Sequence, residues 1–220
     1  GLVRRAYCAR QGSSSTIVEA LDRVALTEAG EGSVALYKQS TRDGWKIHTG
    51  HRVKQKESKG EDAVLLFEDG EELRASKIMI AVGRAPGSKN LDVEKAGLKT
   101  FRAGWIETDA NLLAGPDIYA VGDVNGRVLL AHAGEHQAEY AVRHAAGLET
   151  AAYDDSAMPS CIYGHHEVMH VGPHADKLAE LYPGKKIEVS SSNLIANPIS
   201  QSYGATHGFV KIGWVDGAVY

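Results

Sequence analysis

The segment Ile118–Asp123 is the feature that most narrows what this chain can fold into. Its apolar residues predict a strand that ends at Gly122 and Asp123, and after a short loop a helical pattern covers residues 131–146. This order of strand, glycine turn and helix is typical of nucleotide-cofactor sites in α/β proteins. Gly122 allows close backbone approach, Asp123 can accept hydrogen bonds from sugar or ribitol hydroxyls, and amides near Ala131 can face an electron-rich group.

Composition excludes several other classes of function. The chain has 220 residues, enough for one large core or two modest ones, and its net charge of −4 gives no electrostatic argument for a nucleic-acid or anionic-membrane partner. No apolar run approaches the roughly 20 residues that span a bilayer. The two cysteines, Cys8 and Cys161, form no CxxC or metal-ligand spacing. This usage favours a reducing cytoplasm, with both cysteines as buried small hydrophobic residues.

The two ends of the chain look like edges of a larger protein. Residues 1–12 predict a helix in which Arg4 and Arg5 form a solvated face or contact a phosphate. Residues 15–19 predict a short buried strand that ends in an acid. A helix followed by a strand is half of a dinucleotide-binding unit whose first strand is missing. At the other end, residues 209–215 alternate like a strand, and Asp216-Gly217 predicts a turn into a return strand.

Between these ends, the pattern predicts a mixture of α/β and α+β elements. Residues 77–82 form a continuous apolar run, which predicts a strand buried on both faces before the turn at 83–86. The remaining expected elements are a turn-rich stretch at 20–33, a helix that closes over 34–41, a strand at 45–48, a hairpin at 61–74, a short helix or turn at 91–98, a loop at 150–159, strands at 161–163 and 167–171, a helix at 174–182 and a strand near Ile187.

Further motifs occur along the whole chain in a characteristic order. They are Gly1, Thr16–Glu19, Ala81–Pro86, Ile118–Asp123, Leu130–His132, Met158–Tyr163, Glu167-Val168 with Val171-Gly172, and Gly208–Ile212. In this order they resemble the motifs of the flavoprotein disulfide reductases, the pyridine nucleotide-disulfide oxidoreductases, and most closely those of dihydrolipoamide dehydrogenases. The order of the motifs, more than any single one, carries the resemblance.

The resemblance implies an α/β fold in three pieces. Residues 1–86 are expected to form a Rossmann-like NAD-binding domain that lacks its first strand, 87–155 a central segment that completes an FAD-binding domain, and 156–220 part of an α+β interface (dimerisation) domain. The implied activity is electron transfer between a dithiol or disulfide substrate and NAD through FAD, in a cytoplasmic homodimer. Two alternatives stay open: another flavin reductase of the same fold, of the mercuric reductase or NADH oxidase type, and a non-catalytic nucleotide-binding or dimerisation fragment.

The resemblance also implies a set of cofactor-binding residues. Asp123 would bind the FAD ribitol, and amides at the start of the helix would stabilise negative charge on the flavin ring. Glu19 would accept hydrogen bonds from a ribose and repel a 2′-phosphate, which favours NAD, although Arg23 nearby weakens that preference. Arg84 could meet the cofactor or simply cap its turn. The full expected set is Gly1, Glu19, Val53, Gly83, Asp123, Leu130, Ala131 and His132.

This sequence departs from the family pattern at several positions. Val3 stands where the family usually has Glu, Arg5 stands where it often has Gly, and Gly164-His165-His166 replaces a Thr-x-Pro. The redox-active cysteine pair of the family lies in an N-terminal FAD domain and has no counterpart here, and its catalytic His-Glu pair lies beyond the strand at 208–212. We therefore assign no catalytic residue, and we expect this chain alone to be unable to reduce a disulfide.

Two histidine patterns in the sequence resemble metal-binding motifs, but neither one predicts a metal site. His166–His170 reads HExxH, a zinc-protease signature that requires a helix, whereas the glycines on both sides and the resemblance predict a strand. On a strand the two histidines would lie ~13 Å apart, at about 3.3 Å per residue, too far for one zinc ion. His132 and His136 share a predicted helix face but have no evident third ligand. We assign no metal ligand.

Overall fold

The computed structural model of the chain describes residues 2, 5, 7–8 and 11–219, which form two compact units. One unit contains residues 1–81 together with 159–220, and the other contains residues 82–158. In the described part of the chain, no helix is both long and apolar enough to cross a bilayer. The predicted pieces 1–86 and 156–220 thus fall largely in the same unit, and the three-domain assignment itself stays a prediction.

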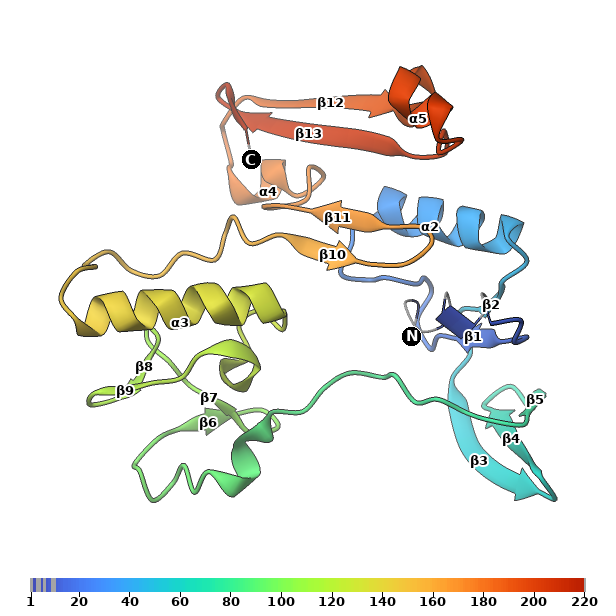
Figure 1. Ribbon diagram of the computed structural model, residues 1–220, viewed down its shortest axis with the longest axis horizontal. Helices are drawn as coiled ribbons and strands as arrows, with labels where there is room; N and C mark the ends of the chain where they lie inside the picture. The colour runs from blue at the N-terminus through green and yellow to red at the C-terminus, as the bar shows by residue number, and fades with distance from the viewer. Residues whose placement is uncertain (1, 3–4, 6, 9–10, 220) are drawn as a thin grey trace. The chain divides into compact units, whose positions relative to one another are not determined.

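The first unit begins with a parallel βαβ arrangement, as predicted. Strand β1 (Thr16–Val18) pairs in parallel with β2 (Lys46–His48), and helix α2 (Gly30–Arg42) connects them (Figure 1). The helix starts within the stretch that the sequence predicts to be turn-rich, and Gly32 and Ser33 are buried on its inner face. Gly32 allows a close contact, since a Cβ at this position would lie 3.3 Å from Val168 Cγ1.

A three-stranded antiparallel sheet follows the βαβ arrangement. Strands β4 (Asp62–Phe67) and β5 (Glu72–Ala75) form the predicted hairpin, and β3 (Val53–Lys59) pairs with β4 on its other side. The sequence does not predict β3, because its residues are mostly charged and exposed and lack the alternation that marks a half-buried strand. The buried side chains of this sheet are Val64 and Phe67.

The prediction of a buried strand at 77–82 is wrong. No residue of this run is assigned to a strand, and the exposed fractions of Met79, Ile80 and Val82 are 50%, 78% and 92%. A strand buried on both faces requires a hydrogen-bonded neighbour and covering side chains, and no described residue pairs with this run. Its apolar composition alone therefore does not make it a strand.

The rest of the first unit packs against α2. The hairpin β10 (Ser160–Ile162) and β11 (Val168–His170) lies beside α2 in Figure 1 and precedes the short helix α4 (Leu178–Leu181). A second antiparallel sheet has the order β12 (Ile187–Asn193), β13 (Phe209–Val215) and β14 (Ala218–Val219). The predicted helix at 174–182 is shortened to α4, whose Leu178 is fully buried.

Two connections join the strands of this second sheet, one between β12 and β13 and the other between β13 and β14. The 3₁₀ turn η3 (Leu194–Ala196) and the helix α5 (Pro198–Ser202) join β12 to β13. The predicted turn at Asp216-Gly217 is confirmed, and both residues have positive φ (50° and 86°), as a type I′ hairpin turn requires.

The second unit consists of short hairpins beside one long helix. Its elements are the 3₁₀ turn η1 (Gly87–Asn90), the pair β6 (Thr100–Phe101) and β7 (Trp105–Ile106), the pair β8 (Leu113–Gly115) and β9 (Ile118–Tyr119), the 3₁₀ turn η2 (Gly122–Asn125) and the helix α3 (Ala131–Ala145). Residues 91–97 form the expected turns. The strand before Gly122 is shorter than predicted, and α3 matches its predicted range closely.

The N-terminal residues differ from expectation in their burial. Of the predicted helix at 1–12, the described residues 2, 5, 7 and 8 are helical. Arg5 is not a solvated residue: it is 8% exposed, its Nε donates to the Ser15 carbonyl (2.9 Å), and its guanidinium lies 4.9 Å from the Trp45 ring centroid. Arg4 lies outside the described residues. Cys8 and Cys161 are free and only half-buried, so the prediction that they are buried is wrong.

Candidate functional site

The carboxylate of Asp123 lies in the second unit at a junction between three segments. Arg84 Nη1 donates to Asp123 Oδ2 (3.0 Å) and to the Leu129 carbonyl (2.8 Å). Both side chains remain open to solvent, with 61% of Arg84 and 50% of Asp123 exposed. Arg84 thus joins the turn after residue 83 to η2 and to the residue before the α3 cap. It does more than cap its own turn.

A buried amide network holds η2 against α3. Gln137 is fully buried, and its Oε1 accepts hydrogen bonds from the Gly122 amide (2.7 Å) and from Asn125 Nδ2 (2.8 Å). Asn125 Nδ2 also donates to the Ala120 carbonyl. A Cβ at Gly134 would lie 3.2 Å from Gly122 Cα, so the two backbones pack closely. The network fixes the turn that carries Asp123.

Gln137 and Asn125 were not among the predicted site residues. The helix after Leu130 has a hydrophobic pattern in the sequence, and a polar residue inside such a pattern is typical of a surface position. The signal available in the sequence was one glutamine on the same helical face as the alanines at 133 and 141, all three of which are buried.

Helix α3 begins without a capping side chain. Leu130 occupies the N-cap position in an extended conformation and makes no side-chain cap hydrogen bond. The first amides of a helix have no partner within the helix, and the aligned peptide dipoles favour negative charge there. The predicted residues Leu130, Ala131 and His132 therefore lie at a helix start suited to an electron-rich group, next to the Arg84–Asp123 pair.

The other predicted residues with described positions belong mainly to the first unit. Glu19 follows β1, its Oε1 accepts from the Leu21 amide (3.0 Å), and its carbonyl accepts from the His51 amide, two residues before Val53. Val53 is the first residue of β3 and is exposed. The Arg23 guanidinium donates to the carbonyls of residues 25, 26 and 28 and is thereby occupied within its own loop.

Gly83 and Gly1 complete the predicted set. Gly83 belongs to the second unit, has φ of +131°, and would have open space around an added Cβ. Such a φ is strained for any residue with a side chain, so a glycine is required by the backbone itself. Gly1 lies outside the described residues. The second unit thus brings Asp123 and the α3 start together, and the first unit brings Glu19 close to the segment that precedes Val53.

A row of histidines joins the β10–β11 region to α2 and the loop before it. His170 Nδ1 lies 2.7 Å from Glu28 Oε2, and the Glu28 side chain is only 1% exposed. His174 Nε2 lies 2.9 Å from the Thr27 carbonyl, and its ring is 4.4 Å from that of His170, centroid to centroid. His166 Nε2 lies 2.7 Å from Asp43 Oδ2. The two histidines of the HExxH string therefore have different acidic partners, and His170 lies on β11, a strand, as predicted.

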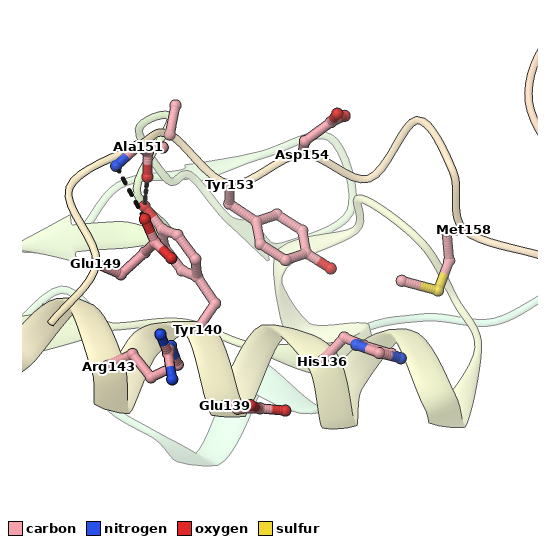
Figure 2. A pocket seen from close by; sticks show the side chains of 10 residues that line it. His136, Glu139, Tyr140, Arg143, Glu149, Ala151, Tyr153, Asp154 and Met158 are labelled. Atoms are coloured by element: carbon pink, nitrogen blue, oxygen red, sulfur yellow. Dashed lines mark hydrogen bonds between the residues drawn. The ribbon is translucent and has the colours of Figure 1, made fainter.

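A cavity of about 330 Å³ lies along α3 in the second unit (Figure 2). In Figure 2 the Tyr140 hydroxyl donates to the Ala151 carbonyl (2.7 Å), and Glu149 accepts from the Ala151 amide (3.2 Å). Burial, together with the charges of Glu149 and Asp109, raises the pKa of Tyr140. The lining contains neither Asp123 nor the first turn of α3, so this cavity is separate from the predicted cofactor residues.

Comparisons with known proteins identify the family. A family model described as pyridine nucleotide-disulphide oxidoreductase matches residues 2–143, which include both Glu19 and Asp123. The chain belongs to this family. Among its curated relatives, a dihydrolipoyl dehydrogenase from Chlorobaculum tepidum is 34% identical over 94% of the chain, and one from Corynebacterium glutamicum is 30% identical over 91%.

The comparisons also define how much of such a protein the chain represents. It spans 44% of the length of both relatives. The crystal structure of LpdA from Mycobacterium tuberculosis matches with a TM-score of 0.87 and 21% identity, over 96% of this chain and 46% of that one. The flavoprotein disulfide reductase RclA from Escherichia coli matches with a TM-score of 0.82 and 22% identity, over 93% and 47%. These likenesses confirm the predicted α/β fold, and the family match confirms the predicted family.

Proposed function

We propose that this chain forms the NAD-recognising portion and part of the flavin site of an enzyme that moves electrons between a dithiol or disulfide substrate and NAD through FAD. Membership of the pyridine nucleotide-disulphide oxidoreductase family supports this proposal. The observation that carries the flavin part is the exposed Asp123 carboxylate beside the uncapped start of α3. A dihydrolipoamide-type dithiol is the proposed substrate, because dihydrolipoyl dehydrogenases recur among the relatives.

On the flavin side, the residues present fit the polar parts of FAD. Asp123 shares one oxygen, Oδ2, with Arg84, which leaves acceptor capacity on its carboxylate for a ribitol hydroxyl. The amides at Leu130, Ala131 and His132 would stabilise negative charge on the flavin ring during its reduction. FAD, when bound, supplies the redox chemistry, and these residues bind and orient it.

For the second cofactor, the nicotinamide dinucleotide, the arrangement favours NAD over NADP. Glu19 offers a carboxylate for ribose hydroxyls, and a 2′-phosphate would meet the same charge. Arg23, the cation that could reverse this preference, is held by three backbone carbonyls. We assign Val53 and Gly83 to the same cofactor, and Gly1 to the turn beside its phosphates.

The chain alone is proposed to be inactive in disulfide reduction. Its only cysteines, Cys8 and Cys161, lie far apart in the sequence, so the sequence itself offers no cysteine pair for a redox disulfide. The intact enzyme is proposed to be a cytoplasmic homodimer, with residues 156–220 contributing to the dimer interface. Reduction of NAD by dihydrolipoamide in the presence of the purified chain and FAD would contradict the proposed inactivity.

The flavin assignment is tested by titrating the purified chain with FAD and following flavin fluorescence. We expect Asp123→Asn to weaken binding about tenfold, because a hydrogen bond to a charged acceptor contributes about 1.5 to 3 kcal/mol. Asp92→Asn is the matched control, since Asp92 is an exposed acid of the same unit that pairs with Lys95. Equal FAD affinity in Asp123→Asn and the parent chain would contradict the assignment.

A non-catalytic fragment is the second candidate function. The exposed apolar run at 77–82 favours it, because a run of this kind is normally covered in a complete enzyme domain. A chain that binds neither FAD nor NADH, measured by flavin and nicotinamide fluorescence, would support this candidate over the first.

A further inference from the structure

Asp43, His165 and His166 form a compact cluster of metal-ligating groups in the first unit. Their ligand atoms all lie within 4.8 Å of one another. Asp43 follows the last residue of α2, and its amide donates to the Gln39 carbonyl, which anchors it to the helix end. The two histidines lie in the bend between β10 and β11.

Both imidazoles direct the same nitrogen at the same carboxylate oxygen. Nε2 of His166 lies 2.7 Å from Asp43 Oδ2, and Nε2 of His165 lies 3.5 Å from it. The two rings are 4.7 Å apart, centroid to centroid, with an interplanar angle of 50°. Donors bound to one zinc-sized ion at about 2.0 to 2.2 Å lie roughly 3 to 3.5 Å apart, so small side-chain rotations would bring this set to a common centre.

The exposure of the cluster suits an ion that enters from solvent. The side chains of His165, His166 and Asp43 are 54%, 21% and 35% exposed. Coordination positions beyond the three protein ligands would therefore be filled by water. The ion would replace the Asp43–His166 hydrogen bond with two bonds to itself.

We propose that Asp43, His165 and His166 bind a divalent transition-metal cation of the zinc, copper or nickel type. Two imidazoles and one carboxylate suit these borderline cations, whereas calcium and magnesium favour ligand sets made of oxygen. The bound ion cross-links the end of α2 to the β10–β11 bend, which lies more than 120 residues later in the sequence. Metal binding therefore stabilises the first unit against unfolding, because the unfolded chain does not hold these ligands together.

The HExxH string points to a different and incorrect set of ligands. It pairs His166 with His170, but His170 is engaged with the buried Glu28. The ligands that converge are two adjacent histidines and an aspartate from a distant segment. Sequence spacing cannot reveal that combination.

A second group in the same unit provides an internal control. His51, Asp69 and Glu71 also lie within 4.8 Å of one another, but this group offers one imidazole and two carboxylates. His51 Nε2 is 4.0 Å from Asp69 and 3.7 Å from Glu71. Copper and zinc favour the set with two imidazoles, so His51→Ala is the matched variant for His165→Ala.

The experiment uses the untagged chain, stripped of metal with a chelator. One equivalent of Cu²⁺ is added, and electron paramagnetic resonance reports how many imidazole nitrogens bind it. Zn²⁺ affinity is measured by calorimetry, because zinc does not oxidise Cys8 or Cys161. We expect coordination by two nitrogens in the parent chain and in His51→Ala. We expect one nitrogen, with Zn²⁺ affinity lowered by about ten- to a hundredfold, in His165→Ala.

A stability measurement distinguishes a lost ligand from a lost fold. Zn²⁺ should raise the unfolding temperature of the parent and of His51→Ala but not that of His165→Ala, and all three should unfold alike with chelator present. His165→Gln, which keeps a polar side chain, replaces the alanine variant if that variant does not fold. Equal Zn²⁺ affinity in the parent and the His165 variants, or loss of binding only in His51→Ala, would overturn the proposal. Neither readout depends on flavin or NAD.

Discussion

Two acid–base pairs, one in each unit, have similar geometry and opposite surroundings. Glu28 and His170 approach to 2.7 Å, and the Glu28 side chain is almost completely buried. Arg84 and Asp123 approach to 3.0 Å, and both are largely exposed. A buried carboxylate that loses its partner pays the full cost of desolvation, whereas an exposed one regains water. The first pair therefore holds the fold together, and the second holds a site ready for a ligand.

The strongest test of this contrast is removal of the buried carboxylate. We expect Glu28→Ala to lower the unfolding free energy of the first unit by about 2 to 3 kcal/mol, because it removes the hydrogen-bond partner of His170 and leaves a cavity in place of an almost completely buried side chain. Urea unfolding followed by Trp45 and Trp214 fluorescence reports on that unit, and Trp105 reports on the other. Glu28→Gln, which keeps a hydrogen-bond acceptor, should lose less. A loss below about 0.5 kcal/mol in Glu28→Ala would remove the contrast between the pairs.

In the second unit, the close contact between Gly126 and Trp105 should contribute more to stability than the ion pair between Arg84 and Asp123. Gly126 has φ of +70°, and a Cβ there would lie 2.6 Å from the Trp105 ring. Gly126→Ala should therefore destabilise this unit by about 1 to 3 kcal/mol through strain and steric overlap. Trp105 fluorescence during urea unfolding measures the effect. Gly147→Ala, at a position with similar φ and open space, controls for the backbone strain alone.

The exposed pair should contribute little to stability. Arg84→Gln is expected to change the unfolding free energy of the second unit by less than about 1 kcal/mol, and added salt should shrink the difference further. The same denaturant titration with Trp105 as reporter measures it. A loss of unfolding free energy as large as that of Glu28→Ala would mean that the Arg84–Asp123 pair stabilises the fold and is not kept available for a ligand.

The smallest expected effect concerns an exposed acid whose pKa is shifted. Lys185, at 2.7 Å, and the Lys186 amide bind the Asp216 carboxylate and hold its pKa below the ordinary value of 3.8. Because the folded pKa is the lower one, this stabilisation is complete above that ordinary value and disappears as pH falls through the folded pKa. Asp216→Asn should therefore be slightly less stable than the parent at neutral pH and equal to it in strong acid. Thermal melts across this range check the expectation, and a gap that persists in strong acid would refute it.

Sequence patterns predicted the local elements of this fold better than its long-range pairings. The strands β1 and β2, the α3 range and the turn at Asp216-Gly217 follow from periodicity and turn chemistry, which are local. The prediction of a buried strand at 77–82 is wrong because such a strand depends on neighbouring strands that its own residues do not specify. Strand β3 was missed because its side chains are exposed, and pairing with β4 determines its conformation.

The candidate site shows the same division. The position of Asp123 beside the start of α3 could be predicted, because both belong to one continuous motif; their role as cofactor-binding residues stays a prediction. The roles of Arg84 and Gln137 could not, because their partners are separated from them along the chain: Arg84 reaches Asp123 across 39 positions, and Gln137 reaches the Gly122 amide across 15. The sequence places Arg5 on a solvated helix face, yet the Trp45 ring and the Ser15 carbonyl give its guanidinium a buried location.

The bare apolar run at 77–82 also has consequences for how the chain behaves in concentrated solution. It is rich in β-favouring residues, contains no proline, and pairs with no strand in the described part of the chain. Segments of this type act as templates on which identical copies add edge to edge. The isolated chain should therefore self-associate as its concentration rises, and its yield in a cell should depend on how quickly a partner strand or a chaperone covers Met79, Ile80 and Val82.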